Sequence, residues 1–111
     1  DWVVRMKTII YNKLVRDKIP KIIEDSGKTC EIEVLDDKTY LEMLDKKLTE
    51  ELNEYYESHN AEELADLLEV IYAAAKGHGY TKEQLEEIRQ NKADKRGAFD
   101  KKILLKSVTE E

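Results

Sequence analysis

Residues 60–76 constrain the fold of this chain more than any other segment, because they are apolar on almost every side of a helix. At about 100° per residue, the side chains that form one narrow polar seam are Glu62, Glu69 and Lys76. A helix that is apolar on its other sides is expected to be buried on those sides. Glu63 and Asp66 lie off the seam, about one helical turn apart. A buried carboxylate is costly unless it is paired or bound to a metal, so these two acids call for an explanation.

The other predicted helices are defined by their ends. A helix over 16–26 has Asp17 as a candidate N-cap, Pro20 close to its first turn and Gly27 after its end. A capping box that starts at Thr39 opens a second helix, over 39–57, with a stripe of leucines along it. Asn60 is the expected N-cap of the helix over 60–76. A second capping box opens a fourth helix over 81–94.

Two short apolar runs, 29–35 and 103–108, predict a minor pair of strands. Two strands alone are marginally stable in water, so the pair would have to rest on the helices. We therefore expect an all-α, mostly helical domain with a short strand pair. Residues 6–111 form this domain, and residues 1–5 are interpreted as an upstream extension because Met6 is a natural start.

The size of the chain favours self-association. With 111 residues it fits one domain, and 40% of the residues are charged while 7% are aromatic. A small helical hairpin with large polar faces often completes its core with a second copy. The expected assembly is a four-helix bundle formed by oligomerisation, as a homodimer or homotetramer.

The charge and the cysteine count exclude several classes of function. The formal net charge of -6 repels a phosphate backbone, so nucleic acid is not an expected partner. One cysteine, Cys30, and two histidines exclude a thiolate zinc site. The chain has no apolar run long enough to span a membrane and no signal-peptide pattern, so the expected location is the cytoplasm and no membrane partner is expected.

A matching pair of acids lies in the second predicted helix. Glu51 sits at the edge of the leucine stripe and Glu54 follows one turn later. If the two helices pack antiparallel, these acids can meet Glu63 and Asp66. Four carboxylates without histidine or cysteine favour Mg²⁺, or alternatively Mn²⁺. The alternative is that these are solvated surface acids and that Glu63 completes a capping box with Asn60.

The same acids resemble a family signature. Residues 50–54 and 63–66 read EELNE and ELAD, which is similar to the E-E-x-x-E … E-x-x-D signature of the all-α nucleoside triphosphate pyrophosphatases, the superfamily of MazG and phosphoribosyl-ATP pyrophosphohydrolase. Residues 11–23 and 92–105 resemble the opening and closing segments of a subgroup regarded as house-cleaning enzymes for non-standard nucleotides. Two features depart from the family pattern: a short spacer between the two acid motifs, and Ala98 in place of a second glycine.

The resemblance implies Mg²⁺-dependent hydrolysis of a nucleoside triphosphate to its monophosphate and pyrophosphate. The implied metal ligands are Glu51, Glu54, Glu63 and Asp66. Glu50 would orient or deprotonate the attacking water, although its position on the helix also fits a solvated surface acid. Basic residues that would bind the triphosphate are Lys13, Arg16, Lys92, Lys95 and Arg96. The alternative from another class is a non-catalytic helical protein-interaction module, whose acids would only be solubilising.

Overall fold

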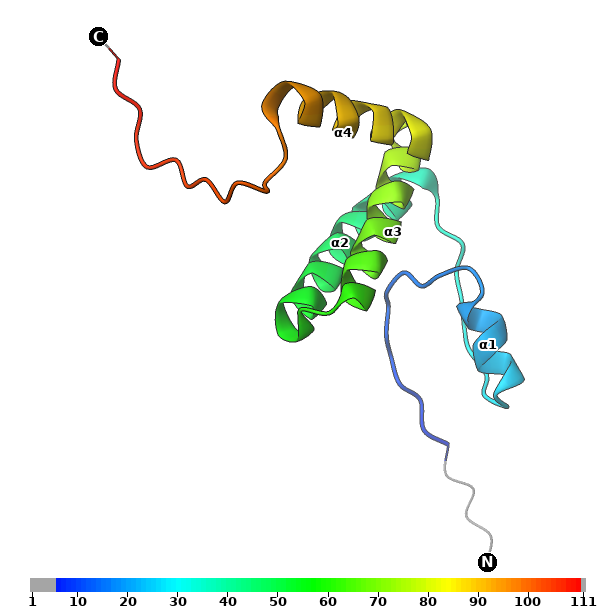
Figure 1. The fold of residues 1–111 in the computed structure, drawn as a ribbon. Coiled ribbons are helices and arrows are strands. Elements are labelled where there is room, and N and C mark those ends of the chain that lie inside the picture. The colour runs from blue at the N-terminus through cyan, green and yellow to red at the C-terminus, as the bar shows by residue number, and fades with distance from the viewer. Residues whose placement is uncertain (1–5, 111) are drawn as a thin grey trace, which may run out of the picture.

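The computed structural model describes residues 6–110, and within them the regular structure is entirely helical (Figure 1). The elements are α1 (Ile19–Asp25), α2 (Asp37–Ser58), α3 (Ala61–Gly77) and α4 (Lys82–Arg96). The expected all-α class is therefore confirmed. The interpretation of residues 1–5 as an upstream extension falls outside the described part of the chain.

The helices α2 and α3 form an antiparallel hairpin joined by a very short turn (Figure 1). His59 ends α2 in the left-handed conformation, with φ of 54°, and Asn60 returns to extended backbone. The Asn60 side chain accepts a hydrogen bond from the Glu63 backbone N–H at 3.0 Å, which confirms Asn60 as the N-cap of α3.

The predicted start of α2 is wrong by two residues. Asp36, not Thr39, is the N-cap, and its carboxylate accepts a hydrogen bond from the Thr39 backbone N–H at 2.8 Å. This hydrogen bond satisfies the Thr39 N–H, which belongs to the first turn of α2 and has no partner within the helix. The helix therefore starts before the capping box that the sequence suggested. The same bond lowers the pKa of Asp36.

Packing between α2 and α3 is close at the end of α3. Leu44 of α2 and Val70 of α3 are the buried apolar residues of the described chain. Gly77 lies so near α2 that a Cβ atom on it would come within 2.7 Å of Leu41 Cδ2. The absence of a side chain at Gly77 lets the end of α3 approach the first turns of α2.

The fourth helix begins as predicted. Thr81 Oγ1 accepts from the Gln84 backbone N–H at 3.1 Å, and the Gln84 side chain accepts from the Thr81 N–H at 2.8 Å, so both bonds of the capping box are present. The helix runs two residues beyond the predicted end and stops at Gly97, whose φ of 84° suits glycine. Its helix contacts within the described chain are with α3.

The first helix is shorter than predicted. It begins at Ile19, directly before Pro20, and Lys18 occupies the N-cap position without a side-chain hydrogen bond. Asp17 is therefore not the cap. Residues 17 and 18 form a turn instead, and Arg16, directly before the turn, pairs with Asp66 of α3.

The predicted pair of strands is wrong. Residues 29–35 and 103–108 carry no strand in the described structure. In Figure 1 they lie on opposite sides of the hairpin, so neither can supply the hydrogen-bonding edge that the other needs. Most of their apolar side chains are exposed: Val34 is 91% exposed and Leu104 is 80% exposed.

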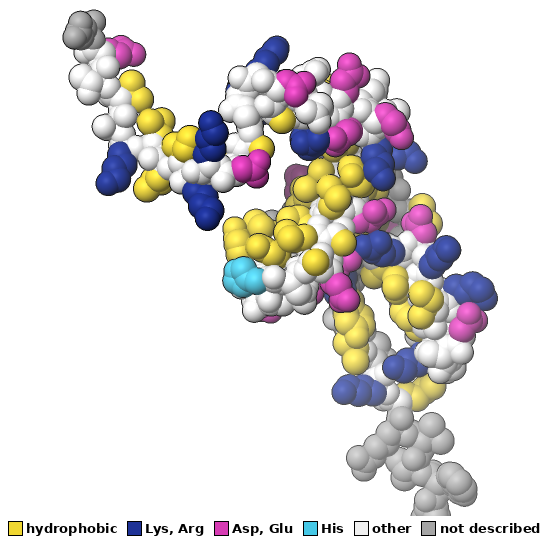
Figure 2. Space-filling view, viewed as in Figure 1, with side chains coloured by type: hydrophobic (Ala, Val, Ile, Leu, Met, Phe, Trp, Pro, Cys, Tyr) yellow, Lys and Arg dark blue, Asp and Glu magenta, His cyan; other side chains and the backbone are white. Residues whose placement is uncertain are grey.

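The single chain is extended rather than closed around a core. Its principal extents are 84 × 31 × 24 Å and its radius of gyration is 20.3 Å, against roughly 13 Å for a folded chain of about 100 residues. Hydrophobic side chains gather on the visible face of the hairpin and again along the C-terminal segment (Figure 2). Exposed large hydrophobic residues of the hairpin and of the C-terminal segment include Leu52, Tyr56, Leu64, Leu68, Ile71, Phe99 and Ile103.

Candidate metal centre

The candidate site is an acid cluster on the hairpin, which we define as Glu50, Glu51, Glu54, Glu63 and Asp66. Glu51 is its centre and the buried charged residue of the described chain, with 6% of its surface exposed. It lies two turns beyond Leu44, on the same side of α2. Its Oε1 is 3.2 Å from Lys47 Nζ, while its Oε2 is buried without a hydrogen-bond partner. Such an unsatisfied group costs about 1–3 kcal/mol.

The first turns of α3 bring two more carboxylates to Glu51. Carboxylate oxygens of Glu51, Glu63 and Asp66 lie within 4.8 Å of one another. The spacing of three residues puts Glu63 and Asp66 on one side of α3, and the antiparallel hairpin turns that side toward α2. The predicted convergence of acids from the two helices is therefore present for these three residues.

The alternative interpretation of Glu63 as half of a capping box does not describe its side chain. The Asn60 backbone N–H donates to Ser58 Oγ at 3.4 Å, and no return bond from the Glu63 carboxylate accompanies the Asn60 cap. Instead, Glu63 Oε2 is a buried oxygen without a hydrogen-bond partner. The Glu63 side chain thus lies between α2 and α3, close to Glu51.

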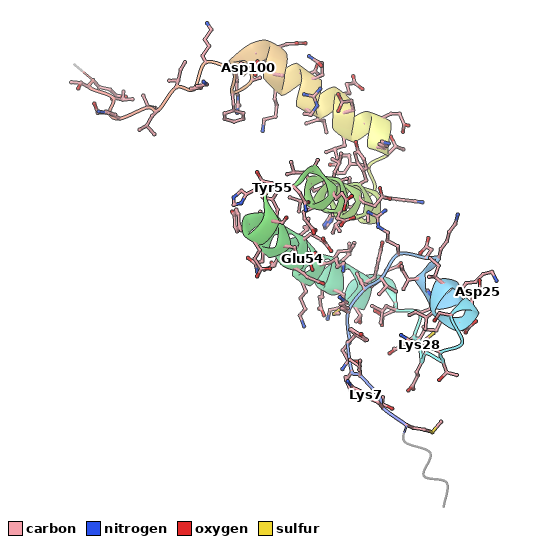
Figure 3. The ribbon with its side chains drawn as sticks, turned by 60° about the horizontal axis from the view of Figure 1, so that its bottom comes forward. Lys7, Asp25, Lys28, Glu54, Tyr55 and Asp100 are labelled. Atoms are coloured by element: carbon pink, nitrogen blue, oxygen red, sulfur yellow. The ribbon has the colours of Figure 1, made fainter. Side chains whose placement is uncertain are left out.

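A second group of acids lies along α2. Oxygens of Glu50, Glu51 and Glu54 also lie within 4.8 Å of one another, so Glu51 belongs to both groups. Glu54 lies on α2, next to Tyr55 (Figure 3), and is half-buried. The four predicted ligands thus form two overlapping sets that share Glu51, and Glu50 joins the set on α2.

Burial and neighbouring charges shift the pKa values of this cluster in opposite directions. Burial raises the pKa of Glu51, and Glu54 adds to that rise while Lys47 opposes it. Burial also pushes the pKa of Glu50 upward, but hydrogen bonds from Lys13 and Lys47 outweigh it and leave that pKa lowered. Negative charge is therefore disfavoured at Glu51 and favoured at Glu50, one residue away.

Lys47 also belongs to the candidate site, although it was not among the residues predicted from the sequence. Its ammonium group is 3.2 Å from both Glu50 Oε2 and Glu51 Oε1, and its side chain is 17% exposed. Burial lowers the pKa of Lys47, but the two carboxylates outweigh burial and leave that pKa raised. Its spacing of three and four residues from the two acids is the signal that predicts this pairing.

Two of the predicted phosphate-binding residues lie at the acids themselves. Lys13 Nζ is 3.1 Å from Glu50 Oε1, and Arg16 Nη2 is 2.6 Å from Asp66 Oδ1. Both belong to residues 6–18, here called the N-terminal arm, which precedes α1 and contains no helix. The arm thus brings positive charge to acids on both α2 and α3.

The other predicted basic residues do not join the acid cluster within one chain. They are Lys92, Lys95 and Arg96, all exposed near the end of α4. The helix α4 leaves from the far end of α3, whereas the acids lie toward the hairpin turn (Figure 1). Asp100, just beyond α4, is well separated from Glu54 in Figure 3.

The residues present fit a hard divalent cation. Glu51 and Glu63 each offer a buried oxygen that lacks a hydrogen-bond partner, and a metal ion would satisfy both. Every candidate ligand in the two groups is a carboxylate, the donor type that Mg²⁺ and Mn²⁺ prefer. The histidines stand elsewhere, as the residues that end α2 and α3.

Comparison of the chain with known protein families, with curated proteins and with solved structures finds no match. Within residues 6–110, none of the helices combines the length and the apolar character that crossing a membrane requires.

Proposed function

We propose that the protein hydrolyses a non-standard nucleoside triphosphate to its monophosphate and pyrophosphate in a Mg²⁺-dependent reaction. The observation that carries the proposal is Glu51, a buried carboxylate with an unsatisfied oxygen, within 4.8 Å of ligand atoms of Glu63 and Asp66. A solubilising surface acid would not be buried in this way. The resemblance of the acid motifs to the all-α pyrophosphatases supplies the reaction class, and Mn²⁺ is the alternative ion.

The carboxylates of Glu51, Glu54, Glu63 and Asp66 would hold the metal. When bound, Mg²⁺ would supply positive charge for the triphosphate oxygens, would lower the pKa of an attacking water and would let an acidic protein bind a polyanion. A water would form a bond to the α-phosphorus as the bond from that phosphorus to the bridging oxygen of pyrophosphate breaks, and the proton of the water would pass to bulk solvent.

Glu50 is proposed to orient the water rather than to take its proton. A general base works best with a pKa near the working pH. Burial pushes the pKa of Glu50 upward, but in the metal-free chain the ion pairs with Lys13 and Lys47 leave it lowered. Lys47 is a neighbour on the same helix and would stay beside Glu50 during the reaction, which makes Glu50 a weaker base. Its carboxylate can still accept a hydrogen bond from water, which is the role that its surroundings favour.

A second copy of the chain is part of the proposal. One chain buries only two apolar side chains among its described residues, and the hairpin leaves Leu64 and Leu68 about half exposed. Two hairpins packed together would form the four-helix bundle of a homodimer, or of half a homotetramer. The basic end of α4, which does not approach the acids of its own chain, could then contribute to the site of another copy.

The test is pyrophosphate release from a panel of standard and damaged nucleoside triphosphates, with Mg²⁺ and with a chelator. Hydrolysis that requires Mg²⁺ is expected from some members of the panel. Asp66→Asn and Glu63→Gln should each lower kcat by about 10²-fold or more while the circular dichroism spectrum stays unchanged. Glu62→Gln, on the exposed seam of the same turn, is the matched control and should keep wild-type activity.

The exposed apolar face also favours a second candidate, a non-catalytic interaction module. That function needs no metal, and it predicts that replacing Asp66 leaves the stability of the fold unchanged or raises it. A folded protein that binds neither Mg²⁺ nor Mn²⁺ and releases no pyrophosphate would contradict the enzyme and favour this alternative.

A further inference from the structure

The N-terminal arm is held on the acid cluster by two ion pairs that connect it to different helices. Lys13 reaches Glu50 on α2, and Arg16 reaches Asp66 on α3. Residues 12–14 also line a small cavity against α2, and Leu14 is partly buried there. The arm therefore lies across the two helices that carry the acids.

These contacts are weak enough to be exchanged. The Lys13 and Arg16 side chains are 41% and 57% exposed, and ion pairs with that exposure add little to stability. The arm has no helix, and its apolar residues other than Leu14 are exposed. The arm is thus held to the hairpin mainly by the charges of Lys13 and Arg16 and not by apolar packing.

The carboxylates that hold the arm are also members of the metal-ligand groups. Asp66 belongs to the set with Glu51 and Glu63, and Glu50 belongs to the set on α2. Meanwhile Glu51 Oε2 and Glu63 Oε2 have no hydrogen-bond partner. A cation entering between these free oxygens would meet the arm's positive charge beside it, and like charges at this range repel.

We propose that the N-terminal arm is a cationic strap that competes with the metal ion for the acid cluster. Metal loading displaces Lys13 and Arg16 from Glu50 and Asp66, and the released side chains then bind phosphate oxygens of the substrate. This inference rests on the proposed function, because it takes the acid cluster to be the metal site. Its new content is that the same two side chains oppose metal binding and favour binding of the triphosphate.

The test compares the affinities of full-length variants for two probes. Arg16→Gln should tighten the binding of Mn²⁺ or Mg²⁺ about two- to five-fold in titration calorimetry, which is the range set by exposed ion pairs. The same variant, saturated with metal, should bind inorganic tripolyphosphate about three-fold or more weakly. Arg89→Gln removes an arginine that is paired with Glu86 on α4, away from the acids, and should change neither affinity.

A second measurement follows the arm itself. In ¹⁵N-labelled wild-type protein, metal addition should shift the backbone amide resonances of residues 12–18, because Lys13 and Arg16 lose their carboxylate partners and this segment moves from the helices. In Arg16→Gln these shifts should be smaller. Lys13→Gln should act in the same direction as Arg16→Gln, with Lys21→Gln, which loses an exposed pair with Asp25, as its control.

The outcomes separate the two proposals. If the wild type binds no metal, the proposed function and this inference both fail. If the wild type binds metal but Arg16→Gln leaves that affinity unchanged, or weakens it, Arg16 does not compete with the ion and the inference alone is overturned. A loss of affinity for both probes would make Arg16 a residue that positions Asp66 and would equally refute competition.

Discussion

At the scale of one residue, Glu51 shows that the candidate site lowers the stability of the folded chain. It continues the side of α2 that Leu44 uses for the core, yet it carries a carboxylate with an unsatisfied oxygen. A chain selected only for stability would place an apolar or amide side chain there. Sites of function are where such costly groups persist.

Replacing Glu51 with glutamine is expected to stabilise the metal-free protein by about 1–3 kcal/mol, because the cost of a buried, unsatisfied carboxylate is removed. The same change should weaken metal binding, since the variant loses a charged ligand. Urea denaturation at fixed protein concentration, with chelator present, measures the first effect. Glu69→Gln, on the exposed seam of α3, should change the free energy of unfolding by less than about 0.5 kcal/mol.

The stabilisation by Glu51→Gln should depend on pH. Because the pKa of Glu51 is raised in the folded state, the folded chain binds this proton more tightly than the unfolded chain. The contribution of Glu51 to stability is then fully present below its ordinary pKa of 4.5 and is lost as the pH rises through the raised value. The difference in the free energy of unfolding between Glu51→Gln and the wild type should thus be largest at neutral pH and should disappear below pH 4.5. A gap that widens in acid would contradict this assignment.

At the scale of the element, the short turn between α2 and α3 fixes which acids meet. Asn60 caps α3 and sets where its first turn begins, and Glu63 is the residue whose N–H it binds. Asn60→Ala is expected to cost about 1 kcal/mol of stability, while Asn60→Asp keeps a capping oxygen and should cost little. Thermal unfolding of the three proteins measures this. Equal losses of stability in both variants would show that loss of the capping hydrogen bond is not the cause of the destabilisation.

The helices were predictable where a polar cap and an apolar stripe agree. Asn60 and Thr81 each start a helix as expected, because their side chains bond to the N–H three residues later. The strands at 29–35 and 103–108 were not predictable in this way, since alternation of side chains shows only that a segment can pair. Whether it pairs depends on an available edge, and that is a property of the whole chain.

The candidate site was predictable in its acids and not in its cations. Helical spacing places Glu51, Glu63 and Asp66 on facing sides of a hairpin, and the structure brings their oxygens together. The contacts of Lys13 and Arg16 with Glu50 and Asp66 join residues that are far apart in the sequence. No local pattern encodes such a contact, because it depends on where an irregular arm returns to the helices.

At the scale of the whole molecule, the extended shape of one chain predicts association. Sedimentation is expected to give a mass at least twice the 13.0 kDa of the chain. Leu68→Lys introduces a charge on the exposed apolar face of α3 and should shift the protein toward monomer and lower its unfolding temperature. Glu69→Gln changes the net charge by the same amount on the polar seam and should leave the assembly intact. A wild-type monomer would contradict the expected oligomer.

The two-residue turn at His59 and Asn60 also bears on how the chain folds. The acids of the site come from adjacent helices, so closing the loop between them costs little entropy and their contacts can form early, before any second copy is met. Their mutual repulsion would then oppose the first collapse of the hairpin. Lys47 lies one turn before Glu51 on the same helix. It is therefore beside these acids as soon as α2 forms, and it neutralises part of their charge. Folding speed, as well as metal chemistry, can therefore account for a lysine in this position.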